Sequence, residues 1–541
     1  MPLSSLGRHR ALLFVFPFAV AVALRIYPYL AYGVPYSTDS WSPIRNAEQL
    51  LAYTPTTLGG NPAFDTYNIF WPANSIFGAM ASLVFNVPPI RIMPLLFPVV
   101  GAATVIVFFL VAEKASGSAG VASIASLFLA TAGVDAIFTA GVTKQTYAEP
   151  LFMVSMLLLL WKTEWRTVAL FAVTSVTLAL SHHATALLFL VAAGSIVSVD
   201  SVLLKRRGES IGRKPLLLVI SGAMTVAYFL VYADAGFGQF SSLVNVQSVL
   251  LTLAFLTVFL APVAYHVVSR PTKLLLAEGG LVLAAAVGIL AIGTRTAIVP
   301  SAPAESPALL YSAIPYILLG ALAIFGFRII QLTKDRRNLA FVGGWLAAVL
   351  ALGFLAIFSG VSDGLSLLYR MFAFIGPPAI ILASLALQRA LGGARRTGLF
   401  KGVVVALVLI ISVTSAYQTY AASIQRENVL GGQWAYQQSD LTGAKWMSAN
   451  LAPGNLTLAG DTRMQYLLTD YLGVNVDTAS GYHYLQSPGT AARPAYLVTY
   501  SLMERNGYVQ SIYGVPLPGN WTTSLVQVSP VLYDNGNIII W

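Results

Sequence analysis

The chain of 541 residues contains no cysteine. This absence excludes disulfides, thiolate metal sites and a cysteine nucleophile, and it leaves the redox compartment undetermined. Charge is also scarce, since only 10% of the residues are Asp, Glu, Lys or Arg, whereas soluble domains carry roughly 25%. The sequence has no Walker-type loop, no dinucleotide glycine fingerprint and no internal repeat. These absences argue against ATP-driven chemistry.

Apolar residues are abundant instead. They make up 57% of the chain, and the mean hydropathy is +0.74. Apolar stretches of roughly 17–25 residues, long enough to cross the hydrocarbon core, occur at about thirteen places. Their centres are Val20, Gly101, Ser126, Met156, Thr174, Phe189, Met224, Phe255, Ala285, Leu319, Ala348, Ile380 and Leu407. The sequence therefore predicts a polytopic α-helical membrane protein.

The basic residues predict the orientation of these spans. The formal net charge is +10, but Lys and Arg fall in short clusters between apolar runs, which argues against a nucleic-acid partner. With the N-terminus in the cytoplasm, nearly every cluster lies on the cytoplasmic side, among them 205–214 and 389–401. The first apolar run reaches Tyr32 without a cleavage site, so we expect a retained span. An odd number of spans in the cell membrane then places the C-terminus outside.

The composition changes at about residue 420, where polar residues and Tyr replace the aliphatic runs. We predict a transmembrane domain over 1–419, with a large first outer loop at 33–89, and an extracytoplasmic domain over 420–541. An amphipathic helix at Asp440–Asn450 and short strands indicate a small α/β or α+β fold for the second domain. The expected strands are Asn455–Ala459 and Asn537–Trp541.

Asp39 is the sharpest local signal. It lies in the segment Pro35–Trp41, just beyond the first span, and a polar amphipathic segment follows it. Its carboxylate could accept a proton from an acceptor hydroxyl, or hold a divalent cation against a lipid phosphate. Helix capping is the alternative interpretation, because Ser, Thr and Asp all favour that position.

Three further candidates belong to the outer ends of the first spans. Arg25 could reach the lipid headgroups by snorkelling, or pair with a phosphate. In the second outer loop, 139–149, Lys144 could neutralise a donor phosphate and Glu149 could assist a metal or an acceptor. A solvated loop explains these two residues equally well.

Two more candidates lie at predicted outer turns. His182 and His183 are adjacent between two apolar spans, a costly place for two imidazoles unless they meet water, phosphate or metal. Arg370 follows Tyr369 at the outer end of the penultimate span, and a guanidinium suits bidentate recognition of phosphate oxygens.

The order of these motifs resembles that of the GT-C superfamily of membrane glycosyltransferases, in particular the archaeal branch near the oligosaccharyltransferase catalytic subunit. The motifs are Thr38–Trp41, Thr143–Leu151, Ser181–Thr185, Tyr369-Arg370 and the outer C-terminal domain. The resemblance implies a sugar donor linked to polyprenyl or dolichyl phosphate or pyrophosphate. It also implies that displacement at the anomeric carbon transfers the sugar to a glycan, lipid or protein acceptor.

The resemblance also implies roles for individual residues. Asp39 is the expected catalytic or metal-binding acid, and Asp39 with Glu149 would hold a divalent cation such as Mg²⁺ or Mn²⁺. Arg370, Lys144 and His182 or His183 are the expected phosphate contacts. Because the lipid phosphate is already a competent leaving group, the protein mainly needs to orient the acceptor and stabilise charge.

Three departures from the oligosaccharyltransferase pattern favour transfer of one sugar over transfer of a whole glycan to Asn. Glu149 is preceded by Tyr147 rather than by a second acid, Ala459–Arg463 stands where a sequon-binding motif is expected, and the outer loop at Gly293–Pro307 is short. A secondary transporter and a catalytically inactive subunit remain alternatives from other classes. Transporters usually show internal repeats and polar groups near the membrane midplane, neither of which this pattern favours.

Overall fold

The computed structural model describes residues 8–53, 68–210, 212–233, 246–268, 307–332, 337–358, 364–392, 397–425, 431–451, 458–488, 490–510 and 513–541. It divides into two compact units. The helical unit comprises Met1–Arg25, Val99–Thr139 and Lys144–Thr419. The α/β unit comprises Ile26–Pro98, Ala140–Thr143 and Tyr420–Trp541.

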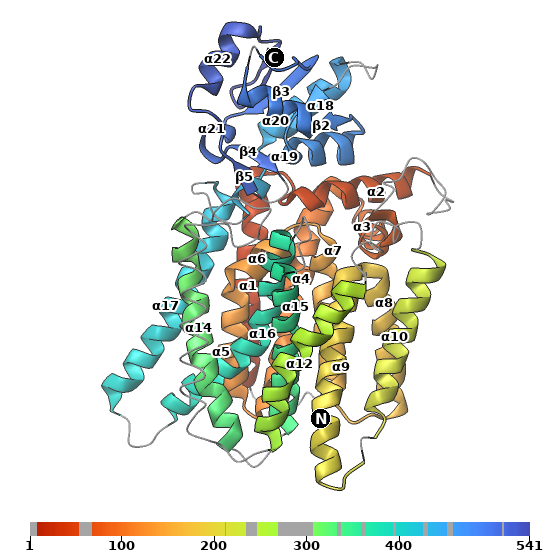
Figure 1. Cartoon of the computed structure of the whole chain (residues 1–541), viewed down its shortest axis with the longest axis vertical. Helices are drawn as coiled ribbons and strands as arrows, with labels where there is room; N and C mark the ends of the chain where they lie inside the picture. The colour runs from red at the N-terminus through yellow and green to blue at the C-terminus, as the bar shows by residue number, and fades with distance from the viewer. Residues whose placement is uncertain are drawn as a thin grey trace. The chain divides into compact units, whose positions relative to one another are not determined.

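Apolar helices of different lengths build the helical unit (Figure 1). They are α1 (Arg8–Tyr32, up to Arg25), α4 (Pro89–Ser116, from Val99), α5 (Ala119–Thr131), α6 (Gly133–Thr139), α7 (Lys144–Leu160), α8 (Trp165–Ser181), α9 (His183–Arg206), α10 (Lys214–Val231), α12 (Val246–Val268), α14 (Pro307–Leu332), α15 (Arg337–Phe358), α16 (Gly364–Leu391) and α17 (Gly398–Ser423). Within the described ranges, seven helices are long and apolar enough to cross a membrane, and α5 with α6, bent by 61°, would make an eighth.

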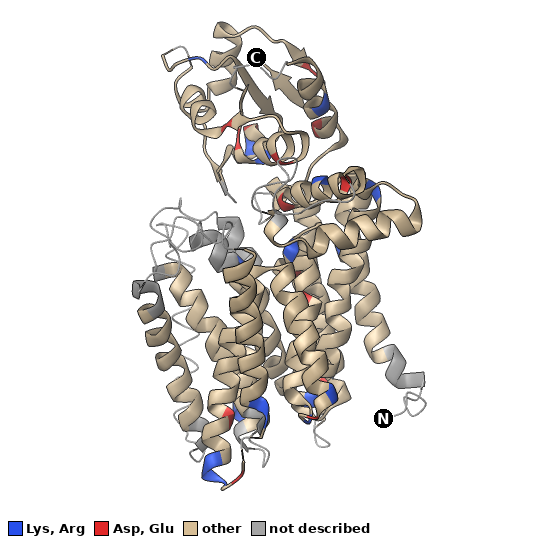
Figure 2. Cartoon of the chain, turned by 90° about the vertical axis from the view of Figure 1, so that its right-hand side faces the viewer, with Lys and Arg blue, Asp and Glu red and all other residues tan. Residues whose placement is uncertain are grey.

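The predicted polytopic helical architecture is confirmed. Every predicted span centre lies in a described helix, except that of the span at Ala285, which falls outside the described residues. Most Lys and Arg residues of the helical unit lie near one end of it, as the sequence pattern predicted (Figure 2). The protein is therefore a multi-pass membrane protein, because its apolar helices have the length and composition that a bilayer requires.

The α/β unit contains a five-stranded mixed sheet in the order β2-β1-β3-β7-β6. Its strands are β1 (Leu458–Ala459), β2 (Val476–Asp477), β3 (Tyr496–Tyr500), β6 (Tyr533–Asp534) and β7 (Ile538–Ile540). β1 pairs in parallel with β2 and β3, whereas β7 pairs antiparallel with β3 and β6. β4 (Tyr508–Gln510) and β5 (Tyr513–Val515) form a separate antiparallel pair. The small mixed fold expected at the C-terminus is thus present.

Short helices complete the α/β unit. They are η2 (Thr38–Ser40), α2 (Trp41–Ala52), η4 (Asn68–Phe70), α3 (Ala73–Phe85), η5 (Gly432–Trp434), α18 (Gln438–Asn450), α19 (Thr462–Gln465), η6 (Tyr466–Leu472), α20 (Thr478–Gln486), α21 (Met503–Asn506) and α22 (Trp521–Val528). Helix α18 begins slightly earlier than Asp440, since Gln437 is its N-cap and Asp440 closes a capping box from the third helical position.

The first loop shares its core with the C-terminal fold. Val34 and Trp41 belong to the hydrophobic core of the α/β unit. The Trp41 ring packs edge-on against Tyr436 at 5.1 Å and at a tilt against Tyr471 at 5.3 Å. Arg45, one turn further along α2, donates to the carbonyl of Thr469 at 3.1 Å. The structure therefore groups 26–98 with 420–541, whereas the sequence pattern placed the loop 33–89 in the transmembrane domain. Long-range packing of one tryptophan decides this grouping, and local composition does not report it.

We expect Trp41→Ala to destabilise the protein by about 3–5 kcal/mol, the usual cost of truncating a buried aromatic residue. Trp41 is fully buried, so its loss leaves a cavity between α2 and the C-terminal core. Thermal unfolding of the purified, detergent-solubilised protein measures this. Tyr53→Ala, at the exposed end of the same helix, is the matched control and should change stability little. Equal stability of the two variants would contradict the shared core.

Candidate active site

Four of the predicted site residues form one electrostatic group in the helical unit. Lys144 opens α7, His182 and His183 lie where α8 gives way to α9, and Arg370 lies in the second turn of α16. Lys144 and Arg370 both interact electrostatically with His182 and His183. Two permanent positive charges and two imidazoles thus converge from three places far apart in the sequence. This cationic cluster is an arrangement that can bind an anion.

The two histidines are held side by side by a very short connection. His182 is the single extended residue between α8 and α9, so the chain reverses within one residue. The two rings lie 5.0 Å apart at 67°, and His182 Nδ1 lies 2.7 Å from the Thr185 hydroxyl. Both side chains are more than nine-tenths buried. The predicted turn at Ser181–His183 is therefore confirmed, and it orients two imidazoles within the protein.

Arg25, Asp135 and Glu149 form a second group in the helical unit. Arg25 is fully buried and pairs with the Asp135 carboxylate, and it donates to Thr139 Oγ1 at 2.7 Å and to the Ala130 carbonyl at 3.2 Å. Asp135 also adjoins the Glu149 carboxyl. Arg25 therefore does not reach lipid headgroups, and its contacts favour a structural role that joins α1 to α5 and α6.

Lys144 and Glu149 were predicted in an outer loop, but the structure places both in helix α7. The reason is visible in the packing. Gln145, Thr146 and Ala148 are buried, and Gln145 Nε2 donates to Glu149 Oε1 at 2.8 Å across one helical turn. Tertiary burial of this polar sequence stabilises a helix where the composition alone resembles a loop.

We expect Arg25→Met to cost about 3–5 kcal/mol of stability, because it leaves the buried Asp135 carboxylate without its cation. The double variant Arg25→Met, Asp135→Asn should recover much of that loss, since neither partner then carries an unpaired charge. Thermal unfolding of both purified variants measures the difference. A double variant less stable than Arg25→Met would show that the ion pair does not explain the burial of Arg25.

Asp39 belongs to the α/β unit, where it lies in the short helix η2 that leads into α2. Its backbone N–H donates to the Ser37 hydroxyl at 3.3 Å. The next residue, Ser40, is fully buried and its hydroxyl accepts from the Val142 backbone N–H at 2.8 Å. The polar amphipathic segment predicted after Asp39 is the helix α2.

A divalent cation needs several oxygen or nitrogen donors that lie close together. Nowhere in the described ranges do three or more His, Asp or Glu side chains form a group that could hold a metal ion. Asp135 is neutralised by Arg25, and Glu149 accepts from Gln145. Among the described residues, Asp135 and Glu149 are thus held by protein partners, and no step below depends on a metal ion.

Asp461 lies in the stretch Ala459–Arg463, which occupies the place where the family resemblance predicts a sequon-binding motif. It accepts hydrogen bonds from Tyr500, from Met464 N at 2.9 Å and from Val509 N at 3.2 Å. Burial raises the pKa of its carboxyl, while the Tyr500 hydroxyl and the other donors lower it. This carboxylate is therefore used inside the fold and is not presented to an acceptor.

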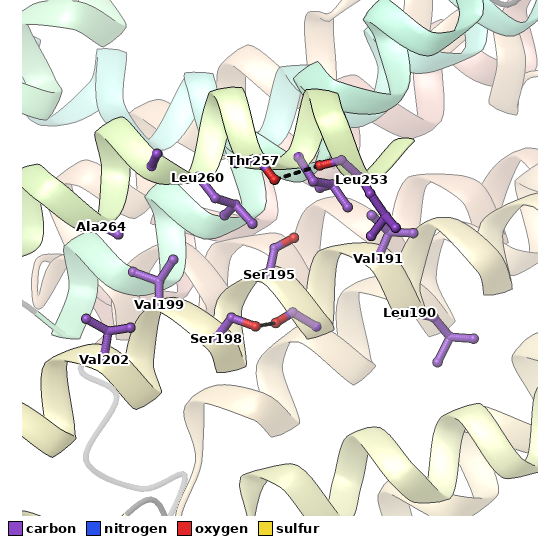
Figure 3. Close-up of a pocket in the computed structure, with 13 residues that line it drawn as sticks. Leu190, Val191, Ser195, Ser198, Val199, Val202, Leu253, Thr257, Leu260 and Ala264 are labelled. Carbon is purple, nitrogen blue, oxygen red and sulfur yellow. Dashed lines mark hydrogen bonds between the residues drawn. The ribbon is translucent and has the colours of Figure 1, made fainter. Parts of the chain in front are cut away.

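An apolar crevice of about 540 Å³ lies between α9 and α12 (Figure 3). Two of its three hydroxyl groups turn back to their own helices, since Ser198 donates to the Gly194 carbonyl at 2.7 Å and Thr257 to the Leu253 carbonyl at 2.8 Å. Leu190, the first of the lining residues on α9, is seven residues from His183, or about 10 Å along the helix. The crevice therefore offers a hydrocarbon-like surface on the helix that begins with His183.

Sequence reasoning missed two residues that shape these groups. Asp135 went unassigned, although a lone acid in an apolar segment, with Arg25 in another, is the signal of an intramembrane ion pair. Ser40 carries no such signal, because its role depends on its contact with Val142, more than a hundred residues away.

No protein-family model matches the chain, and no curated protein matches it in sequence. Solved structures do resemble its fold. The archaeal oligosaccharyltransferase AglB from Archaeoglobus fulgidus, in complex with an inhibitory peptide and a dolichol-phosphate, superposes with a TM-score of 0.57 at 12% identity, over 92% of this chain and 70% of that one. An Archaeoglobus fulgidus oligosaccharyltransferase in the apo form gives 0.54 at 14% identity, over 93% and 71%. Its complex with Zn and sulfate gives 0.52 at 13% identity, over 91% and 68%. The expected fold is thereby confirmed: the chain has the fold of the GT-C membrane glycosyltransferases.

Proposed function

We propose that the protein is a membrane glycosyltransferase that takes a sugar from a polyprenyl-phosphate-linked donor and transfers it, on the extracytoplasmic face, to a glycan, lipid or protein acceptor. The observation that carries this proposal is the cationic cluster of Lys144, His182, His183 and Arg370. His182 and His183 are buried, Lys144 and Arg370 are partly buried, and basic side chains that converge in this way can bind an anion. A lipid phosphate supplies that anion.

The cluster would act on the leaving group. As the bond between the anomeric carbon and the phosphate oxygen breaks, negative charge builds on the departing phosphate, and Lys144 and Arg370 stabilise it. The acceptor oxygen forms the new bond to the anomeric carbon. Asp39 is proposed as the base that takes the acceptor proton. The assignment of Asp39 rests on its sequence position and on the GT-C resemblance, and it is tested separately below.

The crevice between α9 and α12 supports the choice of a polyprenyl carrier. Its lining is apolar, and α9 also carries His183 of the cationic cluster. A phosphate bound at the cluster would leave its isoprenoid chain free to follow this helix. One structural neighbour is a complex with a dolichol-phosphate, and another is a complex with Zn and sulfate. We infer a phosphate-bearing lipid for this chain, and we propose that a divalent cation such as Mg²⁺ or Mn²⁺ assists transfer, which the addition of EDTA tests.

Transfer of a whole glycan to protein Asn is the second candidate, favoured by the fold shared with the oligosaccharyltransferases over most of the chain. The internal contacts of Asp461 argue against it, because this carboxylate does not face an acceptor peptide. The loop at Gly293–Pro307 lies almost wholly outside the described residues. Its short length was the third departure from the oligosaccharyltransferase pattern.

The orientation is also a proposal. The basic clusters at one end of the helical unit (Figure 2) would face the cytoplasm of a cell-membrane protein, and the C-terminal part of the α/β unit would lie outside. Addition of a membrane-impermeant reagent to cells with a single cysteine at an exposed position, such as Glu504→Cys, would label the protein only if that part is outside.

Mass spectrometry of surface-protein glycans and of lipid-linked sugars, in cells lacking the protein, tests the proposed function. A glycan truncated by one sugar, with the corresponding lipid-linked sugar accumulating, is the expected result. Complete loss of protein glycans with accumulation of the full-length lipid donor would identify an oligosaccharyltransferase instead. Unchanged glycans, with a lost substrate flux across the membrane, would identify a transporter.

A further inference from the structure

The backbone two residues before Asp39 is strained. Ser37 has φ 77° and ψ 134°, a conformation that residues with a side chain rarely adopt. Its N–H donates to the Trp434 carbonyl at 3.1 Å, and its hydroxyl accepts from the Asp39 N–H at 3.3 Å. The strained residue is thus fixed on one side to the C-terminal part of the chain and on the other to the segment that carries the carboxylate.

Ser40 fixes the turn from its other end. Its buried hydroxyl donates to the Tyr36 carbonyl and accepts from Val142 N at 2.8 Å. Gly141 leaves no space beside it, since a side chain there would collide with Ser37 and with the Tyr36 backbone. Residues 140–143 therefore pack directly against the Asp39 turn within the α/β unit. They immediately precede Lys144 in the sequence.

We propose that Ser37 and Ser40 are positioning residues that hold the Asp39 carboxylate in its working orientation. Backbone strain persists only where the surroundings over-determine it, and here 141–142 and Trp434 do so from two sides. Transfer of a proton from an acceptor depends on the placement of the base within a fraction of an ångström, so a turn that cannot relax favours the reaction. This inference rests on the proposed role of Asp39 as the base.

Ser37→Gly is the decisive variant. Glycine adopts the Ser37 backbone angles without strain, so the protein should fold with unchanged or raised thermal stability while the turn gains freedom and loses its hydroxyl. We expect the transfer rate at saturating donor to fall at least tenfold, with the KM for donor changed less than twofold. The substrate is the lipid-linked sugar that accumulates in cells lacking the protein, and rates are expressed per folded protein.

Asn86→Gly is the matched control. Among the described residues of the first loop, Asn86 also has a side chain and a positive φ, at 52°, and it caps the end of α3. Its replacement removes a side chain at a second position of positive φ without touching the Asp39 turn, so the rate should not change. An equal loss of rate in both variants would overturn the proposal, as would a normal rate in Ser37→Gly.

Ser40→Ala tests the second contact. Its rate at saturating donor should also fall at least tenfold with KM preserved, whereas Ser82→Ala removes a buried serine that only caps the end of α3 and should keep its rate. A loss in Ser40→Ala that appears in KM alone would overturn the positioning role. If Ser37→Gly and Ser40→Ala keep their rates while Asp39→Asn is inactive, the positioning role fails and the proposed function stands. Activity in Asp39→Asn would instead remove the proposed base.

Discussion

Asp39→Asn is expected to reduce sugar transfer by about 10²–10⁴-fold, the usual contribution of a general acid or base. Asparagine preserves the shape of the side chain and the backbone N–H that donates to Ser37, so the fold should be unaffected. It cannot take up the acceptor proton. The measurement is the rate of transfer from the accumulated lipid-linked sugar by the purified variant, together with glycan analysis of cells that express it.

The control for this experiment is Glu504→Gln, which removes an exposed carboxylate from the same α/β unit. It should transfer at the normal rate, since a surface charge far from the Asp39 turn in sequence contributes little to either stability or chemistry. Full restoration of the glycan by Asp39→Asn in cells lacking the protein would eliminate Asp39 as the base. Such a result would favour a transporter or an inactive subunit.

Arg370→Gln is expected to lower transfer by about 10²–10³-fold, because it removes a donor aimed at charge that develops on the leaving phosphate. Arg370 interacts with both His182 and His183, and its guanidinium lies 5.8 Å from the centre of the Phe138 ring. Glutamine keeps hydrogen-bonding capacity but not the charge. Rates at saturating and limiting donor separate a loss of phosphate binding from a loss of leaving-group stabilisation.

Arg389→Gln provides the matched comparison on the same helix. Arg389 is an exposed residue in the last turn of α16, remote in sequence from the cationic cluster, and its loss should leave the rate unchanged. Arg370→Lys should retain part of the activity, since it keeps the charge but loses the planar fork that suits phosphate oxygens. Equal activity of Arg370→Gln and Arg389→Gln would show that Arg370 does not contact the donor phosphate.

The helices of the membrane region were predictable because a bilayer imposes a length and a composition that can be read locally. The predicted span centres fall in described helices, and the turn between α8 and α9 lies at the predicted histidine pair. The small mixed fold after residue 420 also followed from composition. In contrast, the helical state of Lys144–Glu149 was not predictable, because it depends on burial of Gln145 and Thr146 against other segments.

The residues of the candidate site could be named from the sequence, but which of them lie close together in space could not. Lys144, the two histidines and Arg370 were each singled out as costly polar groups at the ends of apolar runs, and the structure brings these four together. Arg25 was singled out by the same reasoning, yet in the structure it forms an ion pair with Asp135. The sequence cannot distinguish the two outcomes, since both follow from an unfavourable buried charge that needs a partner.

Hydropathy and the distribution of basic residues, both local properties of the sequence, thus determined that this protein crosses a membrane many times and that polar residues collect at the ends of its spans. The tertiary structure alone decided that Trp41 joins the C-terminal core and that residues 141–142 clamp the turn of Asp39. These contacts join residues from about one hundred to more than four hundred positions apart, and packing of that kind depends on the whole chain rather than on any segment of it.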